Sequence, residues 1–268
     1  MSDLNHFLQD SVQFQDGSIQ SYQIGQMKVW LKKASIRHST WIYVPLRWLA
    51  GFFRLKVLTP IPNYGGHKAI QCEIQRIQSL QALGIATPKL LASSEHGLLI
   101  EDAAANGKQV LQLDQALAQL REHPEQQIQL FQAAVDAIST IHTKKSYLSE
   151  AFARNILVNE DHQFTFIDFE TDPGQVLDLH SCQVRDWLCL IFSTAHLFDQ
   201  QQLTQASQIF LDKILPSSKT YLGILKVSHR LRWAQRINFE KLGSDGKRAK
   251  KCFLFFKAIE QQKPLPMI

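Results

Sequence analysis

Two short apolar runs, each next to a polar residue, constrain the fold of this chain more than any other feature. Asn155 stands directly before the run 156–158, and Asp168 stands directly after the run 164–167. An Asn-Glu-Asp turn lies between the runs, so we expect two strands of a hairpin that return both side chains to one end of a sheet. An amide and a carboxylate held together can share a hard divalent cation such as Mg²⁺.

The apolar runs around these two residues strengthen the interpretation of Asn155 and Asp168 as a site. An unpaired carboxylate among buried side chains costs on the order of several kcal/mol, so a buried Asp168 needs a partner, and a metal ion is one candidate. The spacing alone is a weak signal, because Asn and Asp are also common residues of turns.

A lysine and a glutamate earlier in the chain are spaced to complete such a site. Lys32 ends the apolar run 29–32, and Glu73 falls on the apolar stripe of a helix expected over 67–83. A carboxylate on that stripe is unfavourable unless a cation meets it, so we expect an ion pair that holds Lys32 towards nucleotide phosphates. The alternative is a snorkelling lysine and a glutamate at the edge of the core.

The order of patterns along the chain predicts an α+β fold with two lobes and a cleft between them. Residues 1–102 are predicted as a β-rich lobe. It contains an antiparallel meander over 11–34, with turns at 16–17 and 25–26, one helix over 67–83 and a strand over 96–102. Residues 103–268 are predicted as a mainly helical lobe, with an amphipathic helix over 130–141 and long helices from about residue 185.

Several motifs together resemble the protein-kinase-like superfamily over roughly residues 12–192. The paired blocks "NILV" and "IDFE" are its most specific part, and the chain is most similar to the bacterial lipopolysaccharide core kinases that act on Kdo or heptose. The resemblance implies a bilobal kinase-like fold, ATP and Mg²⁺ as cofactors, a catalytic loop over 148–155 and a metal-binding strand end over 164–170.

The resemblance also assigns roles to individual residues. Lys32 in "VWLK" resembles the lysine that holds the nucleotide phosphates, and Glu73 resembles its helix partner. The segment "LLIED" resembles the one that leads into the adenine-binding hinge, and it assigns Glu101 to the nucleotide site. Asn155 and Asp168 resemble the two residues that bind magnesium.

The catalytic loop departs from the pattern of the family. The catalytic aspartate of that family stands five residues before the asparagine, and this chain has Glu150 there, so Glu150 is expected to orient the acceptor hydroxyl. Phe152 replaces a cation found in many relatives, and Arg154 is the nearest substitute. Asp186 in "VRDWLCLIF" resembles the aspartate that supports the loop from the next helix. The phosphate-covering loop has one glycine, Gly17, where protein kinases commonly have three.

The segment 39–64 lengthens the connection between Lys32 and Glu73. It is rich in tryptophan and phenylalanine, and Arg47 and Arg54 interrupt its apolar run, which excludes a transmembrane helix there. An apolar face with basic flanks is typical of a helix that lies on an anionic membrane surface. The alternative is extra core packed on the small lobe.

The distribution of charge indicates where partners bind. Residues 1–110 carry +4, residues 111–225 carry −7 and residues 226–268 carry +8. The basic C-terminal block is either a solvated surface or a surface for lipid headgroups, phosphorylated sugars or nucleic acid. Four cysteines without paired spacing favour neither a zinc site nor a disulfide framework, and residues 1–20 lack a secretory pattern, so we expect a cytoplasmic protein.

These features together favour an ATP- and Mg²⁺-dependent kinase that acts on a sugar hydroxyl of a lipid-linked glycan, such as lipopolysaccharide core. We expect it to work at the cytoplasmic face of the inner membrane. Three alternatives stay open. One is a catalytically silent pseudokinase that serves as a binding or scaffold module. Another is a kinase of soluble acceptors, of the aminoglycoside or choline type. The third is a role with nucleic acid.

Overall fold

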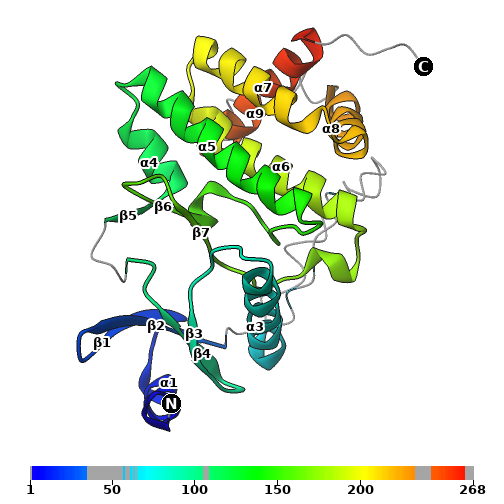
Figure 1. Ribbon diagram of the computed structural model, residues 1–268. Helices are drawn as coiled ribbons and strands as arrows, with labels where there is room; N and C mark the ends of the chain where they lie inside the picture. Colours follow the sequence, from blue (N-terminus) through cyan, green and yellow to red (C-terminus); the bar gives the residue numbers. More distant parts are fainter. Residues whose placement is uncertain are drawn as a thin grey trace.

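The computed structural model describes residues 2–34, 57, 61, 63, 65–104, 109–232 and 243–262 of the chain (Figure 1). These residues form an α+β fold, as the sequence predicted, with a small antiparallel sheet near the N-terminus and a mainly helical remainder. The predicted division at residues 102 and 103 falls between the strands β4 and β5, and it stays a prediction.

The first sheet has four antiparallel strands in the order β1-β2-β4-β3. The strands are β1 (Ile19–Ile24), β2 (Met27–Lys33), β3 (Leu90–Ser93) and β4 (Gly97–Glu101). The predicted turn at residues 25–26 joins β1 to β2, and Gly25 there has a φ of 60°, which glycine adopts without steric cost. Lys32 lies in β2, between Ile19 of β1 and Leu98 of β4.

The chain before β1 is helical, which corrects the prediction that the β meander begins near residue 11. Residues 11–14 are the last turn of α1 (Ser2–Phe14). Leu4, Leu8 and Val12 recur every four residues, which places them on one helix face. Leu8 and Val12 are buried against the first sheet, and this burial outweighs the local β preference of the segment.

A glycine in β4 allows α1 to lie close to the sheet. A Cβ atom at Gly97 would lie 3.1 Å from Cγ2 of Val12 and 2.7 Å from the carbonyl oxygen of Lys32. Real Cβ atoms do not approach backbone atoms so closely, so α1, β4 and β2 pack in this way because position 97 has no side chain.

The helix α3 (Gly66–Ala82), predicted over 67–83, contributes to two hydrophobic cores. Ile70, near its start, packs with Leu98 and Ile100 of the first sheet. Ile77 and Leu80, near its end, belong to the large core of the helical part. Glu73 lies between these two apolar ends, on the buried face of the same helix.

The rest of the described chain combines six helices with a second sheet of three antiparallel strands in the order β5-β6-β7. The predicted hairpin is present, because β6 pairs with β7. The strands are β5 (Val110–Gln112), β6 (Ile156–Asn159) and β7 (Phe164–Phe166). The helices are α4 (Leu113–Gln119), α5 (Pro124–Thr143), α6 (Leu179–Thr194), α7 (Gln200–Ile214), α8 (Ser218–Leu231) and α9 (Gly243–Gln262).

Aromatic side chains fill the centre of this helical part. Trp187 of α6 and Phe255 of α9 both contact Phe210 of α7 edge to face, with ring centroids 5.3 and 5.7 Å apart, and Phe131 contacts Phe198 at 5.2 Å. Such contacts stabilise a core beyond the area they bury. None of the helices in the described ranges combines the length and the apolar character needed to cross a bilayer.

Candidate functional site

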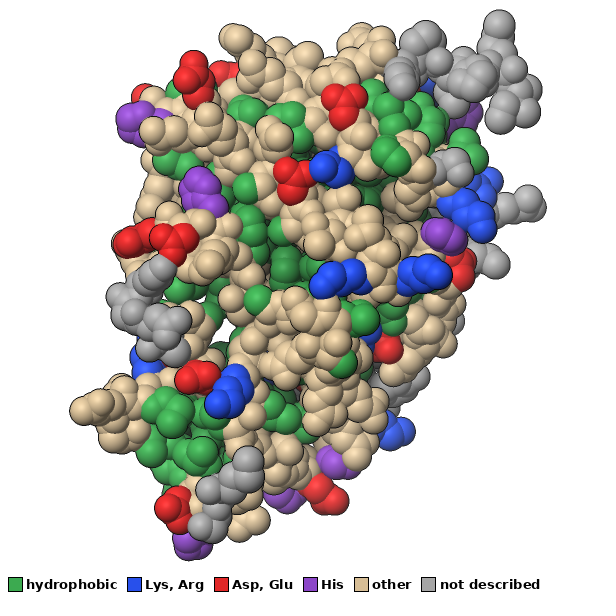
Figure 2. Space-filling model, in the orientation of Figure 1, with side chains coloured by type: hydrophobic (Ala, Val, Ile, Leu, Met, Phe, Trp, Pro, Cys, Tyr) green, Lys and Arg blue, Asp and Glu red, His purple; other side chains and the backbone are tan. Residues whose placement is uncertain are grey.

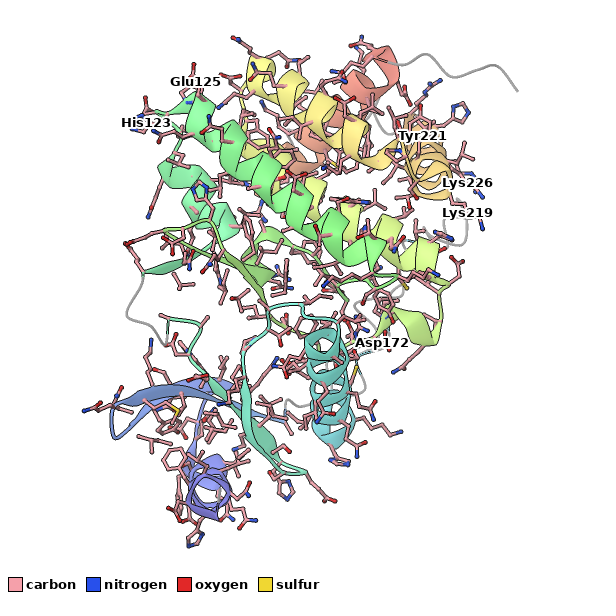
Figure 3. The ribbon with its side chains drawn as sticks, in the orientation of Figure 1. His123, Glu125, Asp172, Lys219, Tyr221 and Lys226 are labelled. Atoms are coloured by element: carbon pink, nitrogen blue, oxygen red, sulfur yellow. The ribbon has the colours of Figure 1, made fainter. Side chains whose placement is uncertain are left out.

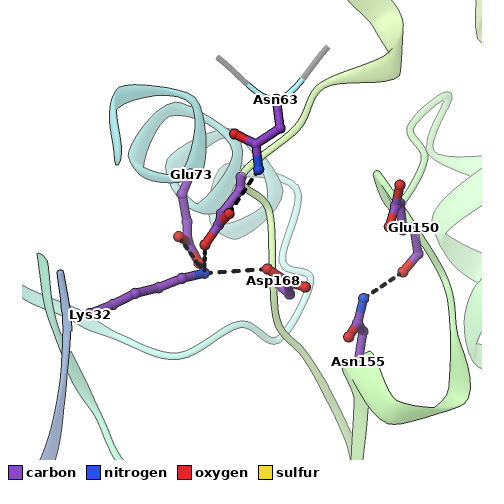
Figure 4. A network of polar contacts seen from close by, with 7 residues as sticks. Lys32, Asn63, Glu73, Glu150, Asn155 and Asp168 are labelled. Atoms are coloured by element: carbon purple, nitrogen blue, oxygen red, sulfur yellow. Dashed lines mark hydrogen bonds and ion pairs between the residues drawn. The ribbon is translucent and has the colours of Figure 1, made fainter. Parts of the chain in front are cut away.

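Lys32 and Glu73 form the ion pair that the sequence predicted (Figure 4). The Nζ atom of Lys32 lies 2.8 Å from Oε2 and 3.0 Å from Oε1 of Glu73. The two side chains are 12% and 3% exposed, so water screens their attraction weakly. The strand β2 supplies the lysine and α3 supplies the glutamate, which joins the sheet to the helix.

The charges around Lys32 determine its protonation. Burial alone would lower the pKa of Lys32, but the carboxylates of Glu73, Asp168 and Glu170 outweigh burial and hold this pKa above its usual range. Burial also raises the pKa of Glu73, while Lys32 opposes that shift. Lys32 therefore carries its charge at neutral pH.

Asp168 reaches the same lysine from the segment after β7. Its Oδ1 atom lies 3.3 Å from Nζ of Lys32, and its side chain is 44% exposed. The backbone of Asp168 has a φ of 70°, a left-handed conformation that is uncommon for a residue other than glycine. Such conformations concentrate at functional sites, where the surroundings hold them.

Sequence reasoning missed Glu170, which also contacts Lys32. Its Oε1 atom lies 2.9 Å from Nζ, closer than the carboxylate of Asp168. The alternation of acidic and apolar residues in "IDFE" was a signal for Glu170, because in an extended segment Asp168 and Glu170 lie on one side and Phe169 lies on the other. Its side chain is buried, and both acids reach the lysine. The lysine therefore faces three carboxylates rather than the predicted one.

Asn155 and Glu150 lie close together in the loop before β6, but through an unexpected contact. Nδ2 of Asn155 donates to the main-chain oxygen of Glu150 at 3.1 Å (Figure 4). The carboxylate of Glu150 accepts from Nη2 of Arg185 at 3.1 Å. Asn155 is buried and stabilises the shape of the loop, while Arg185, which sequence reasoning also missed, holds the carboxylate of Glu150.

The helix α6 supports this loop along its length. Asp186 accepts a hydrogen bond from the backbone N–H of Leu148 at 2.6 Å and contacts Nε2 of His142 at 3.0 Å. Ser193 accepts from the backbone N–H of Ala153 at 2.9 Å. Asp186 is fully buried, and burial raises its pKa. These contacts are the support that the resemblance implied for Asp186.

A pocket of about 540 Å³ lies between the first sheet and the second, and it contains most of the predicted site. Lys32, Glu73, Asn155, Asp168 and Glu101 all line it, together with Glu170. Figure 2 shows the surface hollowed between the two parts of the molecule. The structure therefore brings together five of the six predicted site residues around one space.

Other charged groups line the same pocket. Nζ of Lys28 lies 2.6 Å from Oδ2 of Asp102, next to Glu101 at the end of β4. Arg154 also lines the pocket, and its guanidinium lies 4.9 Å from the ring centroid of Phe152. Glu150 is not a lining residue of this pocket.

The donor set is compatible with a hard divalent cation. Asp168 and Asn155 offer a carboxylate and an amide to the pocket, and the three carboxylates around Lys32 leave two negative charges in excess. Within the described ranges, no group of three or more His, Cys, Asp or Glu side chains is spaced to hold a metal ion. A bound Mg²⁺ would therefore also need water or phosphate oxygens as ligands.

The segment 39–64, and with it the predicted membrane contact, lies almost entirely outside the described residues. Val57, Ile61 and Asn63 are described. The carbonyl oxygen of Val57 accepts from Nη1 of Arg185 at 3.2 Å, and Nδ2 of Asn63 donates to Oε2 of Glu170 at 3.0 Å. The end of this segment thus contacts two residues of the site.

The basic C-terminal block is only partly described, and its charges there are both exposed and paired. Figure 3 shows Lys226 on α8, where its side chain is exposed. Arg232 pairs with Glu260 at 3.0 Å, and Nζ of Lys251 donates to the carbonyl oxygen of Phe198 at 2.7 Å. Whether this block binds lipid, sugar phosphate or nucleic acid stays a prediction.

Compared with protein-family models and with curated proteins, the chain gives no significant match to either.

Proposed function

We propose that this protein is an ATP- and Mg²⁺-dependent phosphotransferase with an alcohol acceptor, built on a protein-kinase-like fold. The observation that carries the proposal is the Lys32–Glu73 ion pair, which lies beside Asp168 in a pocket between a small sheet and a helical part. Phosphoryl transfer depends mainly on positioning and electrostatic stabilisation, and this arrangement supplies both.

Each pocket residue has a role in this proposal. Lys32 binds the phosphates, and Glu73 fixes the direction of its ammonium group. Glu101, at the end of β4, lines the pocket and would lie beside the adenine. Asn155 and Asp168 would hold Mg²⁺, which neutralises phosphate charge and orients the transferred group.

The acceptor that we propose is a sugar hydroxyl of a lipid-linked glycan, such as lipopolysaccharide core. The support is the aromatic and basic composition of 39–64 together with the basic C-terminal block, both of which suit an anionic membrane surface. Glu150 would orient the acceptor hydroxyl. Its carboxylate contacts Arg185 and not the pocket, so this role requires the carboxylate to turn towards the acceptor.

The Glu150–Arg185 contact also favours a second candidate function. The carboxylate of Glu150 is held by an arginine and does not line the pocket, as expected for a protein that has the fold but does not transfer phosphate. Such a protein would act as a scaffold, with or without regulation by nucleotide. The silent protein would transfer no phosphate to any acceptor, and Glu150→Asp would restore no activity.

The test of the proposed function is thermal unfolding with ATP and Mg²⁺. A ligand that binds only the folded state at about 100 times its Kd adds about 2.7 kcal/mol, which corresponds to a rise of roughly 5–10 °C in Tm. We expect this rise for the wild-type chain and its loss in Asp168→Ala, because the variant cannot hold Mg²⁺.

A matched control is Glu122→Gln, which removes one exposed carboxylate in the turn between α4 and α5. This variant should keep the full Mg²⁺-ATP response. An Asp168→Ala variant that responds to Mg²⁺-ATP as strongly as the wild type would contradict the assignment of Asp168 to the metal.

A further inference from the structure

The ammonium group of Lys32 is saturated by carboxylates. Nζ lies 2.8 Å from Glu73, 2.9 Å from Glu170 and 3.3 Å from Asp168. A lysine ammonium has three N–H donors, and here three carboxylates face them. A triphosphate that binds Lys32 must therefore replace at least one of these carboxylates.

The three carboxylates differ in how readily they can leave the lysine. Glu73 is 3% exposed and is anchored on α3, so it stays in place. Asp168 is 44% exposed and makes the longest contact, so it can turn towards a metal ion without a large loss. Glu170 is 21% exposed and makes a short contact, so it is the strongest competitor for an incoming phosphate.

A second contact holds Glu170 in that position. While Oε1 faces Lys32, Oε2 accepts from Nδ2 of Asn63 at 3.0 Å. Asn63 is itself oriented, because its Oδ1 atom accepts from the backbone N–H of Gly65 at 2.9 Å. Each of the two carboxylate oxygens of Glu170 thus has its own partner, which restricts the rotation of the side chain.

We propose that Glu170 is an internal competitor that occupies the phosphate-binding lysine and sets the affinity for nucleotide, and that Asn63 is the residue that positions it. This inference rests on the proposed function, since it concerns the same lysine. The ligand it concerns is a triphosphate anion. Asn63 thereby takes part in the control of nucleotide binding.

The direct test is Glu170→Gln, measured by isothermal titration with Mg²⁺-ATP and, without metal, with tripolyphosphate. Glutamine keeps the size of the side chain but carries no charge, so it attracts Lys32 less strongly. We expect Kd to fall about tenfold for both ligands, which corresponds to about 1.4 kcal/mol. Lys32 keeps Glu73 and Asp168 as partners, so the variant should fold.

A double-mutant cycle tests the role of Asn63. Asn63→Ala alone should lower Kd by a smaller factor, because Glu170 keeps its charge but gains freedom to turn away. In the Glu170→Gln background, Asn63→Ala should change Kd no further. Additive effects of the two substitutions would show that Asn63 acts independently of Glu170 and would overturn its assignment as the positioning residue.

Other outcomes overturn the assignment of Glu170. Weaker Mg²⁺-ATP binding by Glu170→Gln would make Glu170 a ligand of the metal, and an unchanged Kd would make it a bystander. Glu122→Gln is the matched loss of one exposed charge and should change neither Kd. Circular dichroism and the Tm of each variant separate these outcomes from misfolding.

The inference and the proposed function fail separately. A wild-type chain that does not bind Mg²⁺-ATP removes the proposed function. The inference still stands in that case if Glu170→Gln creates binding of tripolyphosphate, because the competitor has then been removed. It falls if neither chain binds tripolyphosphate.

Discussion

The carboxylate of Glu73 is almost completely buried, and Lys32 provides the positive charge beside it. Taking both charges out of water is costly, and their attraction offsets that cost because the geometry is close. The pair therefore has a structural consequence apart from any role in binding nucleotide, and stability measurements can detect it.

Replacing Lys32 with Met leaves Glu73 buried without this cation, which costs roughly 3–5 kcal/mol in comparable buried pairs. Burial raises the pKa of Glu73, and a raised pKa in the folded state gives stability at low pH that is lost as pH rises through it. We therefore expect the loss in Lys32→Met, measured by urea unfolding, to be largest at neutral pH and smaller in acid.

The double variant Lys32→Met with Glu73→Gln is the control. It removes the charge as well as its partner, so it should recover most of the lost stability at neutral pH. If Lys32→Met unfolds at the same urea concentration as the wild type, the ion pair does not contribute to the stability of the fold.

The sequence could reveal Glu73, because a carboxylate on the apolar stripe of a helix breaks a regular pattern. It could not reveal Glu170 or Arg185 with the same clarity. Glu170 contacts Asn63 and Arg185 contacts the carbonyl oxygen of Val57, and both partners belong to the long connection between β2 and α3. Which residues of such a connection lie against the site depends on the tertiary arrangement.

At the scale of elements, α6 is the support of the loop that carries Glu150. Asp178 caps its first turn, where Oδ1 accepts from the backbone N–H of Ser181 at 2.9 Å. That hydrogen bond lowers the pKa of Asp178, although partial burial opposes it. The correct start of α6 depends on this cap, because the first N–H groups of a helix lack partners within the helix.

Asp178→Ala should cost about 1 kcal/mol of stability at neutral pH, a common value for the loss of such a cap. A pKa lowered by folding gives stability that is present above the unfolded pKa and is lost as pH falls through the folded pKa. The difference between wild type and Asp178→Ala in urea unfolding should therefore shrink in acid.

Asp178→Asn serves as the matched control for this cap. Asparagine still offers a side-chain oxygen but has no titratable group, so it should keep most of the stability at neutral pH. Relative to Asp178→Ala, its advantage should not change in acid. If the stability of the wild type changes with pH in the same way as that of Asp178→Asn, the charge of Asp178 does not contribute to the cap.

Elements with a clear period were predictable, and those with mixed signals were not. The hairpin of β6 and β7 and the helix α3 were confirmed within one or two residues. The helix α1 was missed because its apolar residues every four positions are embedded in a polar, glutamine-rich segment, and turn residues 16–17 suggested strands on both sides. Packing on the sheet decided the outcome.

On the scale of the whole molecule, α3 links the two parts, because it contributes to the core of each. The sequence predicted two lobes from the order of patterns. It could not predict that one helix would divide its apolar face between them, because that depends on how the parts meet in space.

Leu80→Ala should therefore weaken the connection between the parts as well as total stability. Leu80 is fully buried, and such truncations cost about 2–5 kcal/mol. Glu73 lies two turns earlier on the same helix, so we also expect a smaller rise of Tm with Mg²⁺-ATP. Calorimetry with and without this ligand measures both effects.

Leu203→Ala is the control, since Leu203 of α7 is equally buried but lies within the helical part. It should lose comparable stability and keep the full response to Mg²⁺-ATP. Equal responses of the two variants would show that α3 does not connect the core to the site.

The α-carbon at position 97, which carries no side chain, lies close to both the N-terminal helix and the strand that bears Lys32. A methyl group at this position would overlap the carbonyl oxygen of Lys32, so the backbone of residue 32 would have to move, and the ammonium group would move with it. The reach of a charged side chain is in this way determined by a contact between uncharged atoms on the opposite face of the sheet.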